Sequence, residues 1–290
     1  MALIIFGGVK RIGKVAEIVV PFMAGAYILM ALIIIGMNIT EIPGVFGLIF
    51  RSAFNLEPAF AGVFGMAIAW GIKRGVYSNE AGQGTAPHAA AAAEVSHPAK
   101  QGLVQAFSVY IDTLFVCTAT GLMILFTGQY NVINPEGGFL AEYIPGAEIG
   151  AEYTQYAVSS HFPTIGAGFV ALSLFFFAFT TIMAYYYMAE TNLSYIIKTD
   201  KPWLKNVLRV IFLVATFFGA VKTAQLAWTF GDIGVGSMAW LNLVAILLLS
   251  KPALKALKDY KAQKKAGKDP VFKPDELGIK NAEIWNDINK

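Results

Sequence analysis

Residues 58–93 read PAFAGVFGMAIAWGIKRGVYSNEAGQGTAPHAAAAA, a segment that is apolar at both ends but charged and glycine-rich in its middle. Gly75, Gly82 and Gly84 allow the backbone to leave helical geometry. Pro87 follows them at a position that suits the first turn of a new helix. The pattern predicts one membrane segment whose helix is broken in the middle.

The composition of the chain is that of a membrane protein. Of the 290 residues, 56% are hydrophobic and 14% are charged, whereas soluble domains carry about 25% charged residues. No Lys or Arg occurs between Lys100 and Lys198, and several apolar runs reach the roughly 20 residues that cross a bilayer. The single cysteine, Cys117, excludes an intrachain disulfide. We therefore expect an all-α, polytopic membrane protein.

Six segments are expected to cross the membrane, at about residues 15–37, 58–93, 102–127, 164–188, 203–221 and 224–249. A polar stretch after the first span has an amphipathic middle that suits the membrane interface. Residues 1–250 are thus predicted to form the transmembrane domain, and residues 251–290 a basic tail.

The distribution of Lys and Arg predicts the orientation, because cytoplasmic loops carry an excess of these residues. Basic groups precede the first and third spans, lie between the fourth and fifth, and follow the sixth. Six spans place all of them in the cytoplasm and the acidic loop near residues 128–163 outside. If Lys73 and Arg74 instead marked a loop, two short spans would replace the broken segment, and every later span would flip.

A broken helix exposes peptide groups that can bind ligands. In lipid each unpaired backbone group costs several kcal/mol, so such a break must face protein or a watered cavity. Carbonyls that end the first half-helix can coordinate a cation, and amides that start the second can receive a carboxylate. This arrangement suits Na⁺ with a zwitterionic amino acid. The candidate substrate-binding residues at the break are Tyr77, Ser78, Asn79, Glu80, Gly82 and Thr85.

Glu80 is the strongest of these candidates, because an ionisable side chain inside a membrane usually marks a functional site. A structural interpretation stands beside this one, in which Glu80 pairs with Lys73 or Arg74 and neutralises the segment. The two interpretations are compatible.

The motif GVYSNEAGQGTAPHAAAAA, followed by HPAKQGLVQAFSVYIDTLFVCTATG, resembles the signature region of the alanine/glycine:cation (sodium:alanine) symporter family. The earlier FGGVKRIGKVAEIVVPFMA resembles the entry into the fifth core helix of that family. The resemblance implies a partial LeuT-type fold, namely the last helix of the first repeat and the five helices of the second. It also implies that the chain is incomplete at its N-terminus, and that it does not transport on its own.

The resemblance further implies a sodium half-site in LFFFAFTTIMAYYYMAE, in the fourth span. Carriers of LeuT type ligate Na⁺ there with two neighbouring hydroxyls and a carbonyl three residues earlier, which here match Thr180, Thr181 and Phe177. Alternatively, each threonine only donates a hydrogen bond to its own helix. Tyr185 lies one turn beyond Thr181 on the same helix face and is a candidate to close over a small substrate. Tyr186 and its neighbour Tyr187 suit an interfacial aromatic belt.

Two further ionisable residues fall inside predicted spans. Asp112 lies in the third span and Asp232 in the sixth, and each is either functional or a structural hydrogen-bonding group. For Asp232, in FGDIGVG, the functional interpretation is that it helps to form a gate or a local break.

The function that these features predict is Na⁺-coupled symport of a small neutral amino acid, alanine or glycine, across a prokaryotic plasma membrane, with the C-terminus in the cytoplasm. The alternative is a pore-forming or structural membrane protein with a re-entrant segment. We expect no enzyme, since the sequence has no G-x-S-x-G, P-loop or H-E-x-x-H motif. We expect no cofactor, no metal other than the coupling Na⁺ and no nucleic acid, and the lipid bilayer is the remaining partner.

Overall fold

The computed structural model describes residues 8–53, 63–134, 137–148, 150–198, 201–221, 224–282 and 284–285. The described chain is mostly helical and divides into two compact units. Unit 1 comprises Met1–Lys73 and Asp112–Val221, and unit 2 comprises Arg74–Ile111 and Lys222–Lys290.

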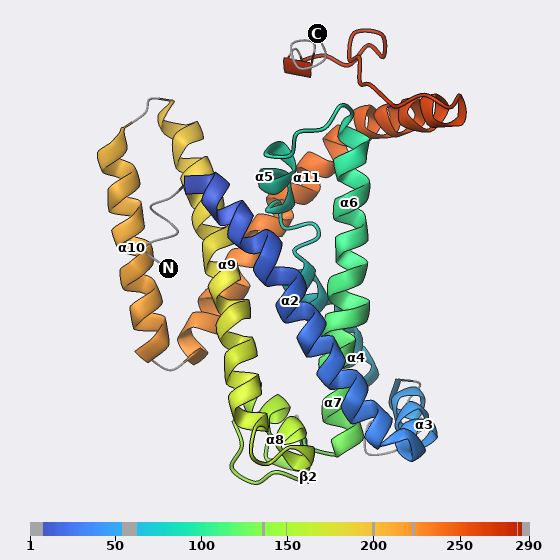
Figure 1. The fold of residues 1–290 in the computed structure, drawn as a ribbon, viewed down its shortest axis with the longest axis vertical. Helices are drawn as coiled ribbons and strands as arrows, with labels where there is room; N and C mark the ends of the chain where they lie inside the picture. Colours follow the sequence, from blue (N-terminus) through green and yellow to red (C-terminus); the bar gives the residue numbers. More distant parts are fainter. Residues whose placement is uncertain are drawn as a thin grey trace. The chain divides into compact units, whose positions relative to one another are not determined.

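The helices of the described chain are α2 (Gly8–Met37), α3 (Ile42–Ala53), α4 (Val63–Asn79), α5 (Ala86–Ala91), α6 (Pro98–Tyr110), α7 (Thr118–Thr127), α8 (Ala151–His161), α9 (Gly166–Ile197), α10 (Pro202–Val221) and α11 (Ala224–Lys265) (Figure 1). A short 3₁₀ turn, η1 (Ile39–Glu41), precedes α3, and a π-helix, η3 (Ile111–Cys117), joins α6 to α7. The strands β1 (Asn131–Ile133) and β2 (Phe139–Glu142) complete the fold.

Five helical stretches of the described chain are long and apolar enough to cross a membrane: Ile12–Met37, Pro98–Thr127, Gly166–Ile197, Pro202–Val221 and Ala227–Lys265. They coincide with five of the six predicted spans. The prediction of a polytopic helical membrane protein is therefore confirmed. The broken segment is not among the five, and its beginning, at residues 58–62, lies outside the described residues, so the count of six stays a prediction.

The core of unit 1 forms where α2, α7, α8 and α9 pack together. Its buried residues are Tyr27, Ala31, Ile34, Ala119, Met123, Ala157, Val158 and Val170. The three residues from α2 recur every three or four positions, so they lie on one face of that helix. The hydroxyl of Tyr27 lies 2.8 Å from Oγ1 of Thr120, so this phenol keeps a polar partner within the core.

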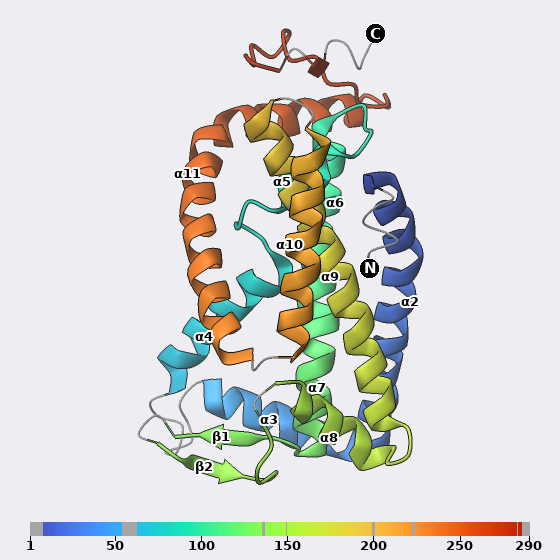
Figure 2. The same ribbon diagram turned by 90° about the vertical axis from the view of Figure 1, so that its left-hand side faces the viewer.

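The acidic loop of unit 1 contains structure that the sequence pattern does not reveal. Strands β1 and β2 pair antiparallel, with Asn131 opposite Glu142, and α8 follows (Figure 2). The buried Asn131 side chain donates to the carbonyl of Ile144 and accepts from its amide, both at 2.9 Å. A Cβ on Gly166, at the start of α9, would lie 2.8 Å from Ser159 of α8, so glycine lets these two helices approach closely.

The contact between α9 and α10 explains how α10 tolerates charge in its first turns. Arg209 donates from Nε to the hydroxyl of Tyr186 at 2.9 Å, and Lys205 lies 4.0 Å from Glu190. Tyr186 is fully buried and packs edge-on against Phe212. The expectation that Tyr186 belongs to an interfacial aromatic belt is therefore wrong, because its ring and its hydroxyl are both used inside unit 1.

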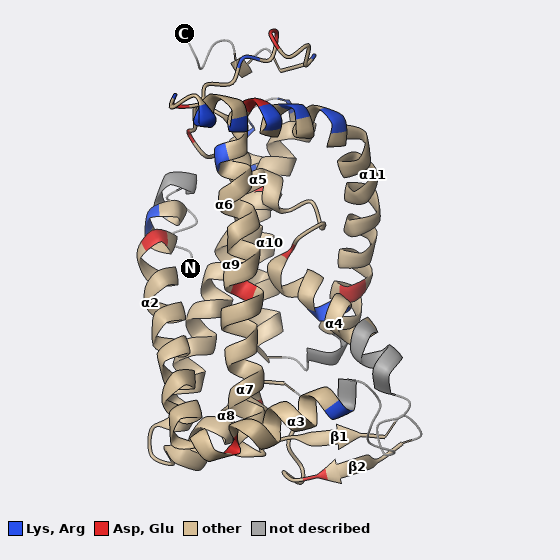
Figure 3. Ribbon diagram, turned by 90° about the vertical axis from the view of Figure 1, so that its right-hand side faces the viewer, with Lys and Arg blue, Asp and Glu red and all other residues tan. Residues whose placement is uncertain are grey.

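In unit 2, α11 continues well past the predicted end of the sixth span and contains Pro252. Figure 2 shows that α11 is sharply kinked, so that its C-terminal part runs in a different direction from its earlier part. A proline inside a helix is expected to cause such a kink. This last part of α11 is rich in Lys, which is drawn in blue, like Arg, in Figure 3. The basic tail thus starts as helix, whereas the composition predicted only a polar extension.

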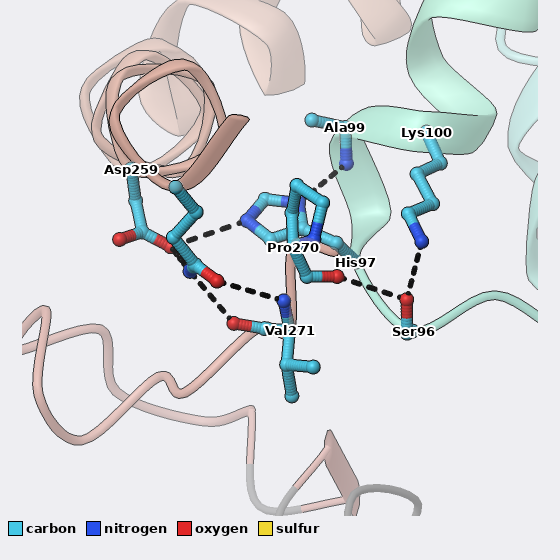
Figure 4. A network of polar contacts seen from close by, with 8 residues as sticks. Ser96, His97, Ala99, Lys100, Asp259, Pro270 and Val271 are labelled. Atoms are coloured by element: carbon cyan, nitrogen blue, oxygen red, sulfur yellow. Dashed lines mark hydrogen bonds and ion pairs between the residues drawn. The ribbon is translucent and has the colours of Figure 1, made fainter. Parts of the chain in front are cut away.

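The residues after α11 bind back to the loop that precedes α6 (Figure 4). The amide of Phe272 donates to the carbonyl of Ser96 at 2.9 Å, and Oγ of Ser96 donates to the carbonyl of Pro270 at 2.9 Å. Lys100 lies 2.6 Å from Asp269. We call this arrangement of Ser96, His97, Lys100 and residues 259–272 the tail clasp.

His97 is the centre of the tail clasp. It is fully buried and lies between the rings of Tyr260 and Phe272, at 5.3 and 5.2 Å between centroids. Its Nε2 lies 3.3 Å from Asp259, and its Nδ1 accepts the amide of Ala99, which caps the start of α6. The tail is therefore a packed part of unit 2 up to this point.

Candidate functional site

The helix breaks where the sequence predicts it. α4 ends at Asn79, residues 80–85 form turns, and α5 begins at Ala86. Glu80, Gly82 and Gly84 have φ of 55°, 88° and 90°, in the left-handed region that no continuous helix contains. Lys73 and Arg74 lie inside α4, so the alternative of a loop at these two residues is wrong.

Side chains within the motif fix the shape of the break. Gln83 donates from Nε2 to the carbonyl of Val76 at 2.5 Å, which satisfies a carbonyl in the last turn of α4. Oδ1 of Asn79 accepts the amide of Ala81 at 2.9 Å. The amide of Gln83 donates to the carbonyl of Glu80 at 3.1 Å. Asn79 thus has a structural task at the break, whether or not it also contacts a ligand.

α11 holds the break from one side. Asn242 donates from Nδ2 to the carbonyl of Gly82 at 2.9 Å, and a Cβ on Gly84 would lie 3.2 Å from Asn242. Asn242 is not among the site residues that the sequence predicts. The only local signal was an amide side chain within an apolar span.

Two buried oxygen atoms at the break have no hydrogen-bond partner among the described residues: Oε1 of Gln83 and Oγ1 of Thr85. The two residues are 2% and 5% exposed. Thr85 occupies the N-cap position of α5, yet its hydroxyl caps no amide there. Leaving a buried polar group unsatisfied costs about 1–3 kcal/mol, so the break presents acceptors that a ligand can use.

α5 is shorter than the predicted half-helix, because it ends at Ala91 after six residues. Pro87 lies in its first turn, as predicted. The carbonyl of Thr85 accepts both the amide and Nδ1 of His88, at 3.1 and 3.0 Å. A helix this short has only a small dipole, so the predicted capture of a carboxylate by its first amides gains little support.

The charged residues before the break form a cluster with the first turns of α11. Arg74 lies 3.6 Å from Asp232, and its guanidinium lies over the rings of Tyr77 and Trp228. The hydroxyl of Tyr77 would lie 2.9 Å from a Cβ on Gly231. Asp232 therefore neutralises Arg74, so Glu80 is not required as the sole partner of that positive charge. α11 is continuous through Asp232, and the expected local break there is wrong.

The candidate sodium ligands of unit 1 lie in the middle of α9, which is helical throughout. The hydroxyl of Thr180 donates to the carbonyls of Phe176 and Phe177, at 3.0 Å each. This is the geometry of the alternative interpretation, although the oxygen lone pairs of Thr180 stay available. The ring of Phe177 packs edge-on against Tyr27. Thr181 and Tyr185 follow on the same helix.

Asp112 lies in the π-helix η3, which the sequence pattern does not predict. Sγ of Cys117 lies 3.8 Å from Oδ2 of Asp112, and the hydroxyl of Thr118 donates to the carbonyl of Thr113 at 3.1 Å, both five residues apart. The wider turn thus brings residues five apart together, and π-turns inside helices often mark functional positions.

Comparison with known proteins assigns the chain to a family. The sequence model of the sodium:alanine symporter family matches residues 1–274. The chain belongs to the sodium:alanine symporter family. It is thus a member of a family of membrane carriers, and not of an enzyme family.

Several relatives of the chain carry names that state a substrate. It is 63% identical over 286 residues to "Putative sodium/proton-dependent alanine carrier protein YrbD" of Bacillus subtilis (strain 168), covering 98% of this chain and 59% of the relative. It is 62% identical to the sodium/proton-dependent alanine carrier protein of Bacillus sp. (strain PS3), covering 97% and 64%. The sodium/alanine symporter AgcS of Methanococcus maripaludis is 41% identical over 86% of this chain and 52% of the relative. The chain therefore spans about three fifths of the length of the first two.

The predicted site residues of the chain fall into two groups. Unit 2 holds Tyr77, Ser78, Asn79, Glu80, Gly82, Thr85 and Asp232, within or close to the break. Unit 1 holds Phe177, Thr180, Thr181, Tyr185 and Asp112. Sequence reasoning missed Gln83 and Asn242, which organise the break itself.

Proposed function

We propose that this chain forms part of a Na⁺-coupled symporter for a small neutral amino acid, alanine or glycine. The observation that carries the proposal is the break at residues 80–85, where α4 ends, three residues take positive φ and two buried oxygens face no protein donor among the described residues. Uncharged oxygens suit Na⁺ and a zwitterion, because they bind cationic groups without a permanent charge inside the membrane.

The names of the relatives support the same class of cargo. Two relatives above 60% identity are named as sodium/proton-dependent alanine carriers, and this high identity extends over nearly the whole chain. The proposal includes glycine, because a site for alanine tolerates the loss of one methyl group at a cost of about 1–3 kcal/mol.

The remaining parts of the proposal concern architecture. The chain contributes six spans of a LeuT-type arrangement, in a prokaryotic plasma membrane, with its C-terminus in the cytoplasm. The basic last part of α11 (Figure 3) supports this orientation, because Lys-rich segments stay on the cytoplasmic side.

The substrate and sodium residues of the proposal are those of the two groups above. At the break, Tyr77, Ser78, Asn79, Glu80, Gly82 and Thr85 contact the amino acid, and Tyr185 of unit 1 is a further substrate-binding residue of the proposal. Phe177, through its carbonyl, and the hydroxyls of Thr180 and Thr181 ligate Na⁺. Asp112 and Asp232 are intramembrane ionisable residues, and the contact with Arg74 supports a structural part for the second.

The test is uptake of radiolabelled alanine into proteoliposomes under an inward Na⁺ gradient, with K⁺ replacing Na⁺ as the control. One sample contains the 290-residue chain alone, and another contains it joined to the part of the Bacillus sp. (strain PS3) relative that it does not cover. We expect saturable, Na⁺-dependent uptake in the second sample, with glycine as a competitor. Flux that rises linearly with alanine concentration would favour the pore alternative, and no flux in either sample contradicts both.

A further inference from the structure

Gln83 holds the break with one end of its amide and presents the other end as an acceptor. Nε2 donates to the carbonyl of Val76. A carbonyl can only accept, so this bond fixes which end of the amide is nitrogen. Oε1 therefore points elsewhere, in a residue that is 2% exposed, and it has no donor among the described residues.

Thr85 provides a second buried oxygen on the same turn. Its hydroxyl is available because it does not cap α5, and its Oγ1 also lacks a partner among the described residues. Gly84, between the two, is fixed against Asn242, where a Cβ would lie 3.2 Å away. Two oxygens from residues 83 and 85 are thus held on a backbone that α11 anchors.

We propose that Oε1 of Gln83 and Oγ1 of Thr85 are ligands for a desolvated monovalent cation, either the coupling Na⁺ or the ammonium group of the bound amino acid. This assignment rests on the proposed function and adds Gln83 to its site. An amide oxygen cannot donate a hydrogen bond, so a carboxylate or another acceptor is excluded at that atom. A cationic group, in contrast, gains from oxygens that have already lost their water.

The assignment separates two tasks of Gln83 that substitutions can isolate. Gln83→Met removes both the hydrogen bond to Val76 and the acceptor oxygen. Gln83→Glu also removes the donated hydrogen bond but keeps acceptor oxygens for a cation. If Gln83 only caps α4, both variants lose function alike.

Gln105→Met is a matched control for the lost hydrogen bond. Gln105 donates from Nε2 to the carbonyl of Ala86 at 3.1 Å, so it too joins a side-chain amide to the backbone of the broken segment. Its carbonyl oxygen is not among the buried atoms that lack a partner.

The experiment measures the rise in melting temperature of the purified protein, in the form that transports, on titration with NaCl against choline chloride, and then with alanine at saturating Na⁺. A ligand that binds only the folded state stabilises it by RT ln(1 + [L]/Kd), so a ligand that binds more weakly needs a proportionally higher concentration for the same rise in melting temperature. We expect Gln83→Met to need at least tenfold more of one ligand for the same rise in melting temperature, while Gln83→Glu and Gln105→Met need less than threefold more. A shift in the NaCl titration assigns the ion, and a shift in the alanine titration alone assigns the ammonium group.

The inference is overturned if Gln83→Met matches Gln105→Met, or if Gln83→Met and Gln83→Glu lose affinity equally. Should Gln83→Met not fold, Thr85→Val and Thr85→Ser replace it: a tenfold loss confined to the valine variant supports the assignment, and equal behaviour overturns it. A wild-type protein that responds to neither NaCl nor alanine overturns the proposed function, and the assignment with it. If the wild type responds to a ligand and Gln83→Met responds equally well, only the assignment of Gln83 and Thr85 as cation ligands is overturned.

Discussion

The side-chain amide of Asn242, in α11, donates a 2.9 Å hydrogen bond to the main-chain carbonyl of Gly82, 160 residues earlier. It thereby satisfies a backbone acceptor that the end of α4 leaves outside any helix. The bond joins the centre of the break to a continuous helix of the same unit. The shape of the break therefore depends on α11 as well as on its own glycines.

Gly82 and Gly84 provide a matched pair that tests this dependence. Both have positive φ, so an alanine at either position strains the backbone. A Cβ on Gly82 meets no atom within 4 Å, whereas a Cβ on Gly84 lies 3.2 Å from Asn242. We expect Gly84→Ala to destabilise the protein more than Gly82→Ala, by about 1–3 kcal/mol of added overpacking. Melting temperatures of the two variants check this, and equal values would mean that α11 does not restrain the break.

For Glu80, the backbone conformation and the side-chain carboxylate can be tested separately. Its φ of 55° is strained for any residue other than glycine, and least so for asparagine. Glu80→Gly and Glu80→Asn should therefore keep the break and the melting temperature. If the carboxylate contacts the substrate or its ion, both variants abolish Na⁺-dependent alanine uptake, while the control Glu94→Gln, at an exposed glutamate, does not. Wild-type uptake by Glu80→Asn removes Glu80 from the site.

The pair of Arg74 and Asp232 is predicted to be structural. Their charged atoms lie 3.6 Å apart, with the side chains 38% and 24% exposed, so each single neutralisation leaves one charge in partly apolar surroundings. We expect Arg74→Gln and Asp232→Asn to lower the melting temperature singly. The double variant should recover part of the loss, with a coupling near the lower end of roughly 0.5–3 kcal/mol because of the exposure. Strictly additive effects would show that the pair contributes nothing.

The sequence predicts the elements whose cause is local. Apolar length predicts five of the helices, and Gly82 and Gly84 before Pro87 predict the break, because glycine adopts positive φ readily. Gly75, which the sequence also predicts to contribute, lies inside α4. Contacts across long separations leave no such signal. Neither the partnership of Asn242 with Gly82 nor that of Asp232 with Arg74 can be predicted without knowing how α11 packs on the broken segment.

Other differences arise where one physical tendency masks another. The tail is rich in lysine, and this charge hides the buried Pro270 and Phe272, through which the tail packs into the tail clasp. The π-helix η3 leaves no mark in the apolar pattern, because Pro98–Thr127 forms one continuous apolar stretch. In the acidic loop, strands of three and four residues are too short to stand out from the surrounding polar sequence.

His97 is predicted to make the tail clasp sensitive to acid. Burial lowers the pKa of His97 below its ordinary value of 6.5, with the neighbouring Lys100 in the same direction and Asp259 opposing. The unfolded chain therefore takes up a proton near pH 6.5, whereas the folded chain resists until a lower pH. The contribution of His97 to the free energy of unfolding should therefore be complete above about pH 6.5. It should decrease as the pH falls through the lowered pKa.

Melting temperatures at pH 8.0, 6.5 and 5.0 check this prediction. We expect the wild type to lose stability toward pH 5.0, and His97→Gln to be less stable at pH 8.0 but to change less with pH. His88→Gln is the control, because it removes a histidine of α5 and leaves the tail clasp unchanged. A wild-type pH dependence that persists in His97→Gln would assign the acid sensitivity to another group.

The hydroxyls of α9 test the sodium half of the proposal. Thr180 donates to the carbonyls of Phe176 and Phe177, so replacing it with valine removes both a hydrogen bond within the helix and an oxygen that could bind Na⁺. Thr191→Val removes only the first of these, because Thr191 donates to the carbonyl of Tyr187 at 2.9 Å two to three turns further along α9. The comparison therefore separates the effect on the helix from the effect on the ion.

We expect Thr180→Val/Thr181→Val to raise the Na⁺ concentration for half-maximal uptake about tenfold, a loss of ~1.4 kcal/mol, and to change the alanine KM at saturating Na⁺ much less. Thr191→Val should leave the Na⁺ dependence at the wild-type value. If the double variant matches Thr191→Val, the two hydroxyls serve only their own helix. In that case the sodium ligands of this chain must be sought at the break between α4 and α5, where Gln83 and Thr85 hold oxygens that lack a partner among the described residues.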